Sequence, residues 1–181
     1  FCVSKKEASK FVLDSLDYAH SLAIKDKKIS IINCPINKNL LKKNKIGVTE
    51  YLAKKCKVKD SSEAMLIKSK NFAVSPITTH IDINEISKKI NSKIIFNKIL
   101  TIHRWYLDKF KKKPKIGVLG LNPHNAELRI NSEEKRIIIP SISKLKKSGV
   151  KVNGPLVADT VFIKEYKNYD LLVGMYHDQV L

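Results

Sequence analysis

The sequence predicts an α/β fold with a parallel-rich sheet. Three short apolar runs have the length and the bounding turn residues of buried strands, and they cover residues 73–79, 115–121 and 170–176. Between these runs lie segments in which apolar residues recur at helical spacing. Because parallel neighbours need a crossover connection, usually a helix, this alternation is typical of α/β folds.

The N-terminal part of the chain predicts a helix, a strand and a further helix. Ser4 and Glu7 have the spacing of a capping box, and apolar residues then recur at helical spacing to about Ile24. Residues 29–34 are rich in β-branched side chains and predict a buried strand. Thr49 is placed to cap a later helix, with an acidic residue next to it in the first turn.

The middle of the chain predicts a long helical stretch after the first apolar run. Asp82 and Glu85 have capping-box spacing, and the helical pattern continues to about Phe110 with an interruption near Asn91. Three consecutive lysines and Pro114 then end the helix.

The C-terminal part predicts two further helix starts and one loop. The helices are expected to begin at Ser132 and after Pro140, and Gly149 supplies a stop. A short extended segment over 150–153 leads into a turn-rich loop that ends at Asp159.

The composition is that of a globular chain. The 181 residues suffice for one substantial core or one and a half domains, and 43% of them are hydrophobic. The chain starts at Phe1 and stops at Leu181 directly after a strand, so we expect an internal fragment, truncated at both ends. The three cysteines include no C-x-x-C pair, and no apolar run approaches the ~18 residues that span a bilayer. These features favour a cytoplasmic protein with no membrane partner.

The net charge of +18 invites comparison with nucleic-acid-binding proteins. However, only Arg104, Arg129 and Arg136 are arginines, and the lysines are scattered along the whole chain. Arginine is the residue favoured for base readout and for bidentate phosphate contacts. We therefore interpret the lysines as solvated surface residues and expect no nucleic-acid partner. A basic nucleic-acid-binding module is the alternative from a different functional class.

Three histidines indicate the site. His80, His124 and His177 each follow one of the predicted strands, and parallel sheets bind ligands outside the carboxyl ends of their strands. Three imidazoles that leave a fourth position open are typical of a catalytic metal site, although each histidine taken alone is more often structural. Asp159 and Asp178 could orient the rings, bind the metal or accept a substrate proton. The alternatives for these two residues are a helix cap and a solvated loop residue.

No dinucleotide fingerprint, P-loop, nucleophile elbow or H-E-x-x-H motif occurs. The residues alone therefore indicate a metal-assisted α/β enzyme. They do not distinguish between a hydrolase, a lyase and an oxidoreductase.

Several motifs together resemble those of one enzyme family. They are LGLNPH, SEE, NGPLVADTVF and MYHDQ, together with CPINK, TEYLA and TTHI nearer the N-terminus. In this order and spacing they resemble the 4-hydroxythreonine-4-phosphate dehydrogenase family over essentially all 181 residues.

The resemblance implies an isocitrate/isopropylmalate dehydrogenase-like fold of two lobes. Residues 1–40 would belong to the first lobe, 41–170 to a central lobe, and 171–181 to the start of the return to the first lobe. It also implies a homodimer with active sites at the subunit interface. The implied cofactors are NAD or NADP and a divalent metal ion (Zn, Mg or Co).

The resemblance implies the oxidation of the secondary alcohol of 4-phosphohydroxy-L-threonine, a small phosphorylated hydroxy acid, in pyridoxal 5'-phosphate biosynthesis. The product is a β-keto acid that decarboxylates. The implied metal ligands are the same three residues, His80, His124 and His177. Thr49 is implied to bind substrate, and Asp159 and Asp178 to act as catalytic neighbours of substrate or metal. No residue of this chain is assigned to the nicotinamide cofactor.

Three positions depart from the family pattern. Val48 stands where a substrate-binding histidine is usual, residues 125–131 replace a Gly-rich loop, and Val180 replaces a glycine. These departures leave open a dehydrogenase of threonate or erythronate 4-phosphate on the same scaffold. They also leave open a family member without catalytic activity.

Overall fold

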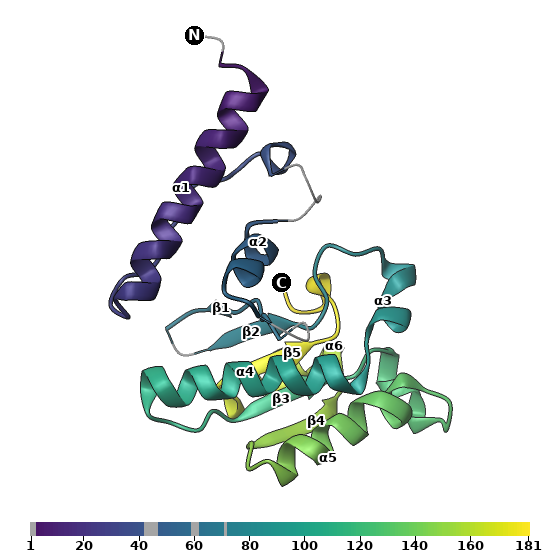
Figure 1. Ribbon diagram of the computed structural model, residues 1–181. Helices are drawn as coiled ribbons and strands as arrows, with labels where there is room; N and C mark the ends of the chain where they lie inside the picture. The colour runs from purple at the N-terminus through teal and green to yellow at the C-terminus, as the bar shows by residue number, and fades with distance from the viewer. Residues whose placement is uncertain (1–2, 42–46, 59–61, 71) are drawn as a thin grey trace. The chain divides into compact units, whose positions relative to one another are not determined.

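The computed structural model describes residues 3–41, 47–58, 62–70 and 72–181 (Figure 1). The chain divides into two compact units, Phe1–Val58 and Lys59–Leu181.

The described residues of the first unit form two α-helices and a short 3₁₀ helix. They are α1 (Lys5–Lys25), a 3₁₀ turn (Lys38–Leu40) and α2 (Val48–Lys55). The capping box predicted for α1 is confirmed: the Ser4 side chain accepts a hydrogen bond from the Glu7 amide, and the Glu7 carboxylate accepts one from the Ser4 amide.

Two expectations for this unit are wrong. Residues 29–34 form no strand, and Ile32 is 96% exposed. A strand needs a ladder partner, and the described residues of this unit contain no other strand. The cap of α2 is Gly47 rather than Thr49, because the extended backbone of Gly47 lets the helix begin at Val48. Thr49 therefore lies inside the first turn.

The second unit is built on one five-stranded sheet in the order β1-β2-β5-β3-β4. The strands are β1 (Ile67–Lys68), β2 (Ala73–Pro76), β3 (Ile116–Leu119), β4 (Val152–Leu156) and β5 (Leu171–Gly174). Strand β1 pairs with β2 in the antiparallel direction, and all the other pairs are parallel. The predicted α/β class with a mostly parallel sheet is confirmed, and the three predicted runs contain β2, β3 and β5.

Strand β4 corrects the sequence prediction. The loop expected from Asn153 onward is a strand as far as Leu156. Gly154 makes this possible, since its φ is +147° and a Cβ there would collide with the carbonyl oxygen of Val118. The glycine thus marks a close approach of β4 to β3 rather than a turn.

The helices in the described part of this unit are α3 (Ile83–Lys89), α4 (Ser92–Phe110), a π-helical turn (Glu134–Ile138), α5 (Ile139–Lys147) and α6 (Ala158–Lys164), together with short 3₁₀ helices. The helices as far as α5 follow the predicted order, whereas α6 was not predicted. The predicted interruption is confirmed, because the Asn91 side chain caps α4 by accepting a hydrogen bond from the Ile94 amide. The stop at Gly149 is also confirmed by its φ of +79°, just after α5.

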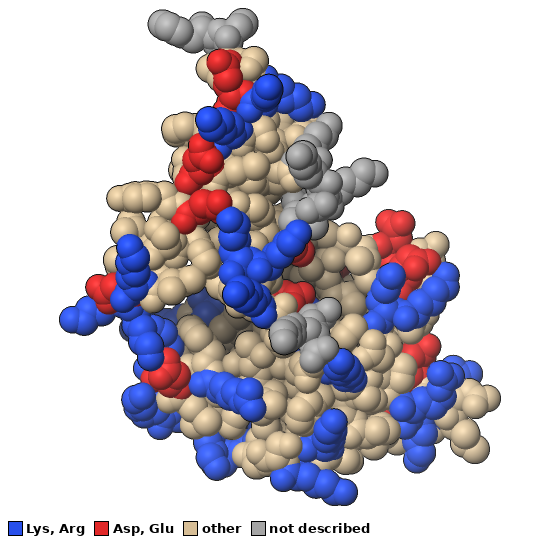
Figure 2. All heavy atoms as spheres, in the orientation of Figure 1, with Lys and Arg blue, Asp and Glu red and all other residues tan. Residues whose placement is uncertain are grey.

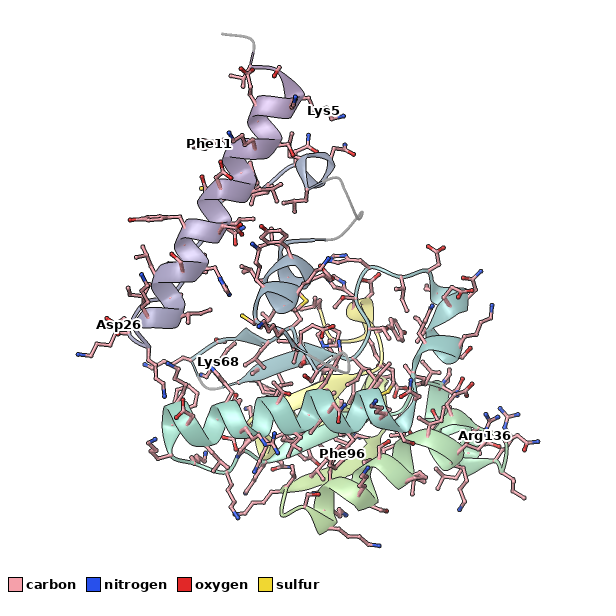
Figure 3. The ribbon with its side chains drawn as sticks, in the orientation of Figure 1. Lys5, Phe11, Asp26, Lys68, Phe96 and Arg136 are labelled. Carbon is pink, nitrogen blue, oxygen red and sulfur yellow. The ribbon has the colours of Figure 1, made fainter. Side chains whose placement is uncertain are left out.

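Apolar residues cover both faces of the sheet. Figure 1 shows α4 and α5 on one face, where Ile99 and Leu145 pack with Val118 and Val173 of the strands. Phe96 of α4 is labelled in Figure 3, and its ring centroid lies 4.5 Å from the ammonium nitrogen of Lys144 on α5.

The other face packs Leu119 and Leu172 against Val161 of α6. Each such fully buried side chain contributes about 1.5–3 kcal/mol. This double coverage explains why the strands are continuous apolar runs in the sequence.

Candidate metal and substrate site

The three strands followed by histidines are adjacent in the sheet. His80 follows β2, His177 follows β5 and His124 follows β3, and the order of these strands is β2-β5-β3. Because all three are parallel, the loops that carry the histidines leave the sheet at the same edge.

Two of the histidines lie side by side. The ring centroids of His80 and His177 are 5.8 Å apart, and the ring planes are tilted by 35°. Both residues line a cavity of about 330 Å³ together with Thr78, Ile86 and Tyr176. An imidazole pair on the wall of a cavity offers two nitrogen ligands to a cation.

Asp178 contacts the second histidine of the pair. Nδ1 of His177 lies 2.7 Å from Oδ1 of Asp178, and the Asp178 side chain is 83% exposed. When Nδ1 carries the proton and donates it to this carboxylate, Nε2 keeps its lone pair for a ligand. Asp178 is therefore a solvated loop residue, as the alternative interpretation expected, but its carboxylate also contacts the His177 ring.

His124 is not part of this pair. Among the described residues, no group of three or more His, Cys, Asp or Glu side chains is arranged to hold a metal ion. His124 is exposed, with a φ of +49°, and the left-handed backbone continues to Leu128. Within one chain, therefore, two of the three expected ligands come together.

A buried carboxylate that the sequence analysis did not assign holds the start of the His124 loop. Glu134 is 0% exposed, and its Oε1 accepts hydrogen bonds from the amides of Leu121 and Asn122, both at 2.8 Å. The Asn122 side-chain amide also donates to Oε2 of Glu134 at 3.1 Å. Burial raises the pKa of Glu134, but the hydrogen bonds outweigh burial, and the pKa lies below its ordinary value. Glu134 is the last residue of the SEE segment, which was noted only as one of the motifs that resemble the family.

Asn125 follows in the same loop and is also buried. Its side-chain nitrogen donates to the carbonyl oxygen of Pro155 at 3.1 Å, which ties the loop to β4. The loop after His124, which is Gly-rich in the family pattern, is therefore anchored here by the Asn125 side chain.

Asp159 and Thr49 lie near the N-termini of helices. Asp159 is exposed in the first turn of α6, directly after β4, and therefore at the same sheet edge as the histidines. The cap of α6 is Val157, so the helix-cap alternative for Asp159 is wrong. Thr49 is exposed in the first turn of α2, in the other unit, and Val48 precedes it.

The surface charge does not gather at one place on the face seen in Figure 2. In the sheet-bearing unit, the Lys and Arg side chains are spread among uncharged and acidic residues. Every helix of the described ranges is too short or too polar to span a bilayer.

Comparisons with known proteins agree on one family. The family model described as pyridoxal phosphate biosynthetic protein PdxA matches residues 1–181. The 4-hydroxythreonine-4-phosphate dehydrogenase of Sulfurihydrogenibium sp. is 36% identical over 186 residues, which cover 100% of this chain and 57% of the relative. The enzyme of that name from Aquifex aeolicus is 40% identical over 163 residues, covering 88% of this chain and 50% of the relative.

Solved structures of proteins with this name also match the chain. The crystal structure of 4-hydroxythreonine-4-phosphate dehydrogenase from Klebsiella pneumoniae matches with a TM-score of 0.84 and 30% identity, covering 94% of this chain and 53% of that chain. This chain thus spans about half the length of the relatives that it matches.

Proposed function

We propose a function on the premise that this chain belongs to the family of the pyridoxal phosphate biosynthetic protein PdxA. The protein that contains the chain oxidises the secondary alcohol of 4-phosphohydroxy-L-threonine with NAD or NADP and a divalent metal ion. The product is a β-keto acid that loses CO₂, in pyridoxal 5'-phosphate biosynthesis. The observation that carries this proposal is the His80–His177 pair at the carboxyl edge of adjacent parallel strands.

The residues present fit a metal ion. Two imidazoles face one cavity, and the Asp178 contact at Nδ1 of His177 leaves the other ring nitrogen available. Imidazole nitrogens suit Zn²⁺ and Co²⁺ better than Mg²⁺. A divalent ion at this position would stabilise the negative charge that develops on the substrate hydroxyl oxygen.

The third ligand is proposed to be His124 of a second copy of the chain. Within the described chain His124 stands apart from the pair, although its strand β3 is adjacent to β5. Two chains that each offer a pair and a single histidine would complete two equivalent sites, as a twofold homodimer requires. The active site would then lie at the subunit interface of the proposed two-lobe fold.

Other residues of the chain would bind the substrate and handle its proton. Asp178 would keep the Nδ1 proton of His177 in place, and Asp159, in the first turn of α6, would accept the proton of the substrate alcohol. The Thr49 hydroxyl would donate a hydrogen bond to the substrate. The nicotinamide cofactor supplies the hydride acceptor.

A second substrate is favoured by one observation. Val48 cannot hydrogen-bond a phosphate or a hydroxyl group. A relative from Oceanobacillus iheyensis whose name proposes a D-threonate 4-phosphate dehydrogenase is 36% identical over 170 residues. The alternative function is therefore oxidation of threonate or erythronate 4-phosphate at the same site.

The test is to express the complete gene and to follow NADH and NADPH formation with each of the three substrates. Zn²⁺, Co²⁺ and Mg²⁺ are supplied in separate assays. Turnover of 4-phosphohydroxythreonine supports the first function, and turnover of only the sugar-acid phosphates supports the second. Absence of turnover with every substrate and every metal would refute both.

A further inference from the structure

We propose that Thr78 and Gln179 are positioning residues that fix the spacing between the three histidine-bearing loops, an inference that rests on the proposed function. Thr78 joins the end of β2 to the end of β5. Its hydroxyl donates to the carbonyl oxygen of Met175 at 2.8 Å, and its amide donates to the same oxygen at 3.1 Å. The residue is buried, with 9% of its surface exposed.

Gln179 joins the end of β5 to the end of β3. Its side-chain oxygen accepts a hydrogen bond from the Met175 amide at 2.7 Å. Its side-chain nitrogen donates to the carbonyl oxygen of Gly120 at 2.7 Å. The opposite orientation of this side chain would place two donors together and two acceptors together, so the network fixes its direction.

These bonds form one continuous chain from Thr78 through Met175 and Gln179 to Gly120. His80 follows Thr78 closely, His177 lies between Met175 and Gln179, and the loop to His124 starts at Gly120.

The chain of bonds lies beyond the sheet itself. The register of β2 with β5 ends at Pro76 and Gly174, and two further backbone bonds, from the Ile77 amide to Gly174 and from the Thr78 amide to Met175, are the last before the histidines. A metal site needs its ligands held to within about 0.5 Å. The side-chain hydrogen bonds of Thr78 and Gln179 add control at this point, where the backbone bonds between the strands end. Both side chains are neutral, and they therefore keep their bonding pattern as the pH changes.

The test measures the affinity of the metal-free, full-length protein for cobalt(II) chloride, by calorimetry and by the visible absorption of the bound ion. Thr78→Val removes the hydroxyl at constant shape, and Thr78→Ser retains it as the matched control. Gln179→Met removes both side-chain hydrogen bonds. Ser141→Ala removes a buried hydroxyl bond from α5, where Ser141 donates to the Ile137 carbonyl at 2.6 Å, and controls for a general loss of stability. Melting curves show that each variant is folded.

We expect Thr78→Val and Gln179→Met to weaken cobalt binding by about tenfold, as outer-shell changes do. Thr78→Ser and Ser141→Ala should stay within about threefold of the wild type. Wild-type affinity in both Thr78→Val and Gln179→Met would overturn the inference and leave the metal site standing. Equal weakening in Thr78→Ser and Thr78→Val would overturn the role of the hydroxyl. A wild-type protein that binds no cobalt would refute the proposed function itself.

Discussion

The carboxylate of Glu134 lies fully buried against the backbone of Asn122, and one oxygen accepts both the Asn122 amide and the Leu121 amide at 2.8 Å. Glu134, the first residue of the π-helical turn before α5, thus fixes the start of the loop after β3. This loop carries His124, so the Glu134 side chain influences the position of His124 through the backbone of Leu121 and Asn122.

Glu134→Gln should destabilise the protein by about 1–3 kcal/mol, the cost of leaving buried partners unsatisfied. The single oxygen of glutamine can still accept the two backbone amides, but its NH₂ group would face the Asn122 side-chain NH₂ that Oε2 now accepts. The exposed Glu127→Gln is the matched control and should change stability by less than about 0.5 kcal/mol. The free energy of unfolding of both variants is measured by chemical denaturation. Equal denaturation midpoints for the two variants would contradict the proposed role of Glu134.

The stability of the protein should fall in acid. The pKa of Glu134 is lowered below 4.5 by its hydrogen bonds despite burial, and that of Asp170 below 3.8, likewise against burial, by Lys112 and the Lys115 amide. A carboxyl group with a depressed folded-state pKa contributes stability that is fully present above its unfolded pKa and is lost as the pH falls through the folded value.

We therefore expect the free energy of unfolding to be insensitive to these groups above about pH 5 and to decrease below it. Glu134→Gln should flatten this decrease, as followed by urea denaturation between pH 3 and 6. An unchanged slope would show that Glu134 binds its proton equally in the folded and unfolded states.

Glu127→Gly should stabilise the loop after β3. Glu127 has a φ of +50°, a left-handed conformation that costs roughly 1–2 kcal/mol for a residue with a Cβ and little for glycine. Part of this gain is offset by the larger backbone entropy of glycine in the unfolded chain, so we expect about 0.5–1 kcal/mol. Asp108→Gly, an exposed position within α4, should lose about 1 kcal/mol instead. Destabilisation by Glu127→Gly would contradict the left-handed conformation.

Val48→His should raise the activity on 4-phosphohydroxythreonine. An imidazole at the start of α2 can donate a hydrogen bond to a phosphate or hydroxyl oxygen of the substrate, and a hydrogen bond to a charged group is worth about 1.5–3 kcal/mol. We expect kcat/KM for this substrate to rise by about tenfold or more over the wild type. Steady-state kinetics of the full-length enzyme measure the change, and an unchanged kcat/KM would argue that position 48 does not contact the substrate.

The sequence predicted the elements whose signals are local. The Ser4–Glu7 capping box and the interruption near Asn91 are confirmed, because both depend on bonds within one helical turn. The capping box predicted for Asp82 and Glu85 is not: Asp82 is the N-cap of α3, but its side chain makes no capping hydrogen bond. The strands β2, β3 and β5 were predicted correctly because burial on both faces makes them continuous apolar runs in the sequence.

Long-range and very short features escaped the prediction. Strand β1 spans only Ile67–Lys68, too short for a periodic pattern. Gln179 reaches Gly120 across the sheet, and nothing near either residue reveals that bond. The histidines were selected because each follows a strand, but adjacency of their strands depends on sheet order, which a single sequence does not encode.

The most direct test is anomalous diffraction at the zinc or cobalt edge from crystals of the full-length protein grown with that metal. The account predicts a single peak per site at about 2.0–2.1 Å from ring nitrogens of His80 and His177, with His124 of a second subunit as the third ligand. A peak at other residues, or no peak at this pair in metal-loaded crystals, would contradict it.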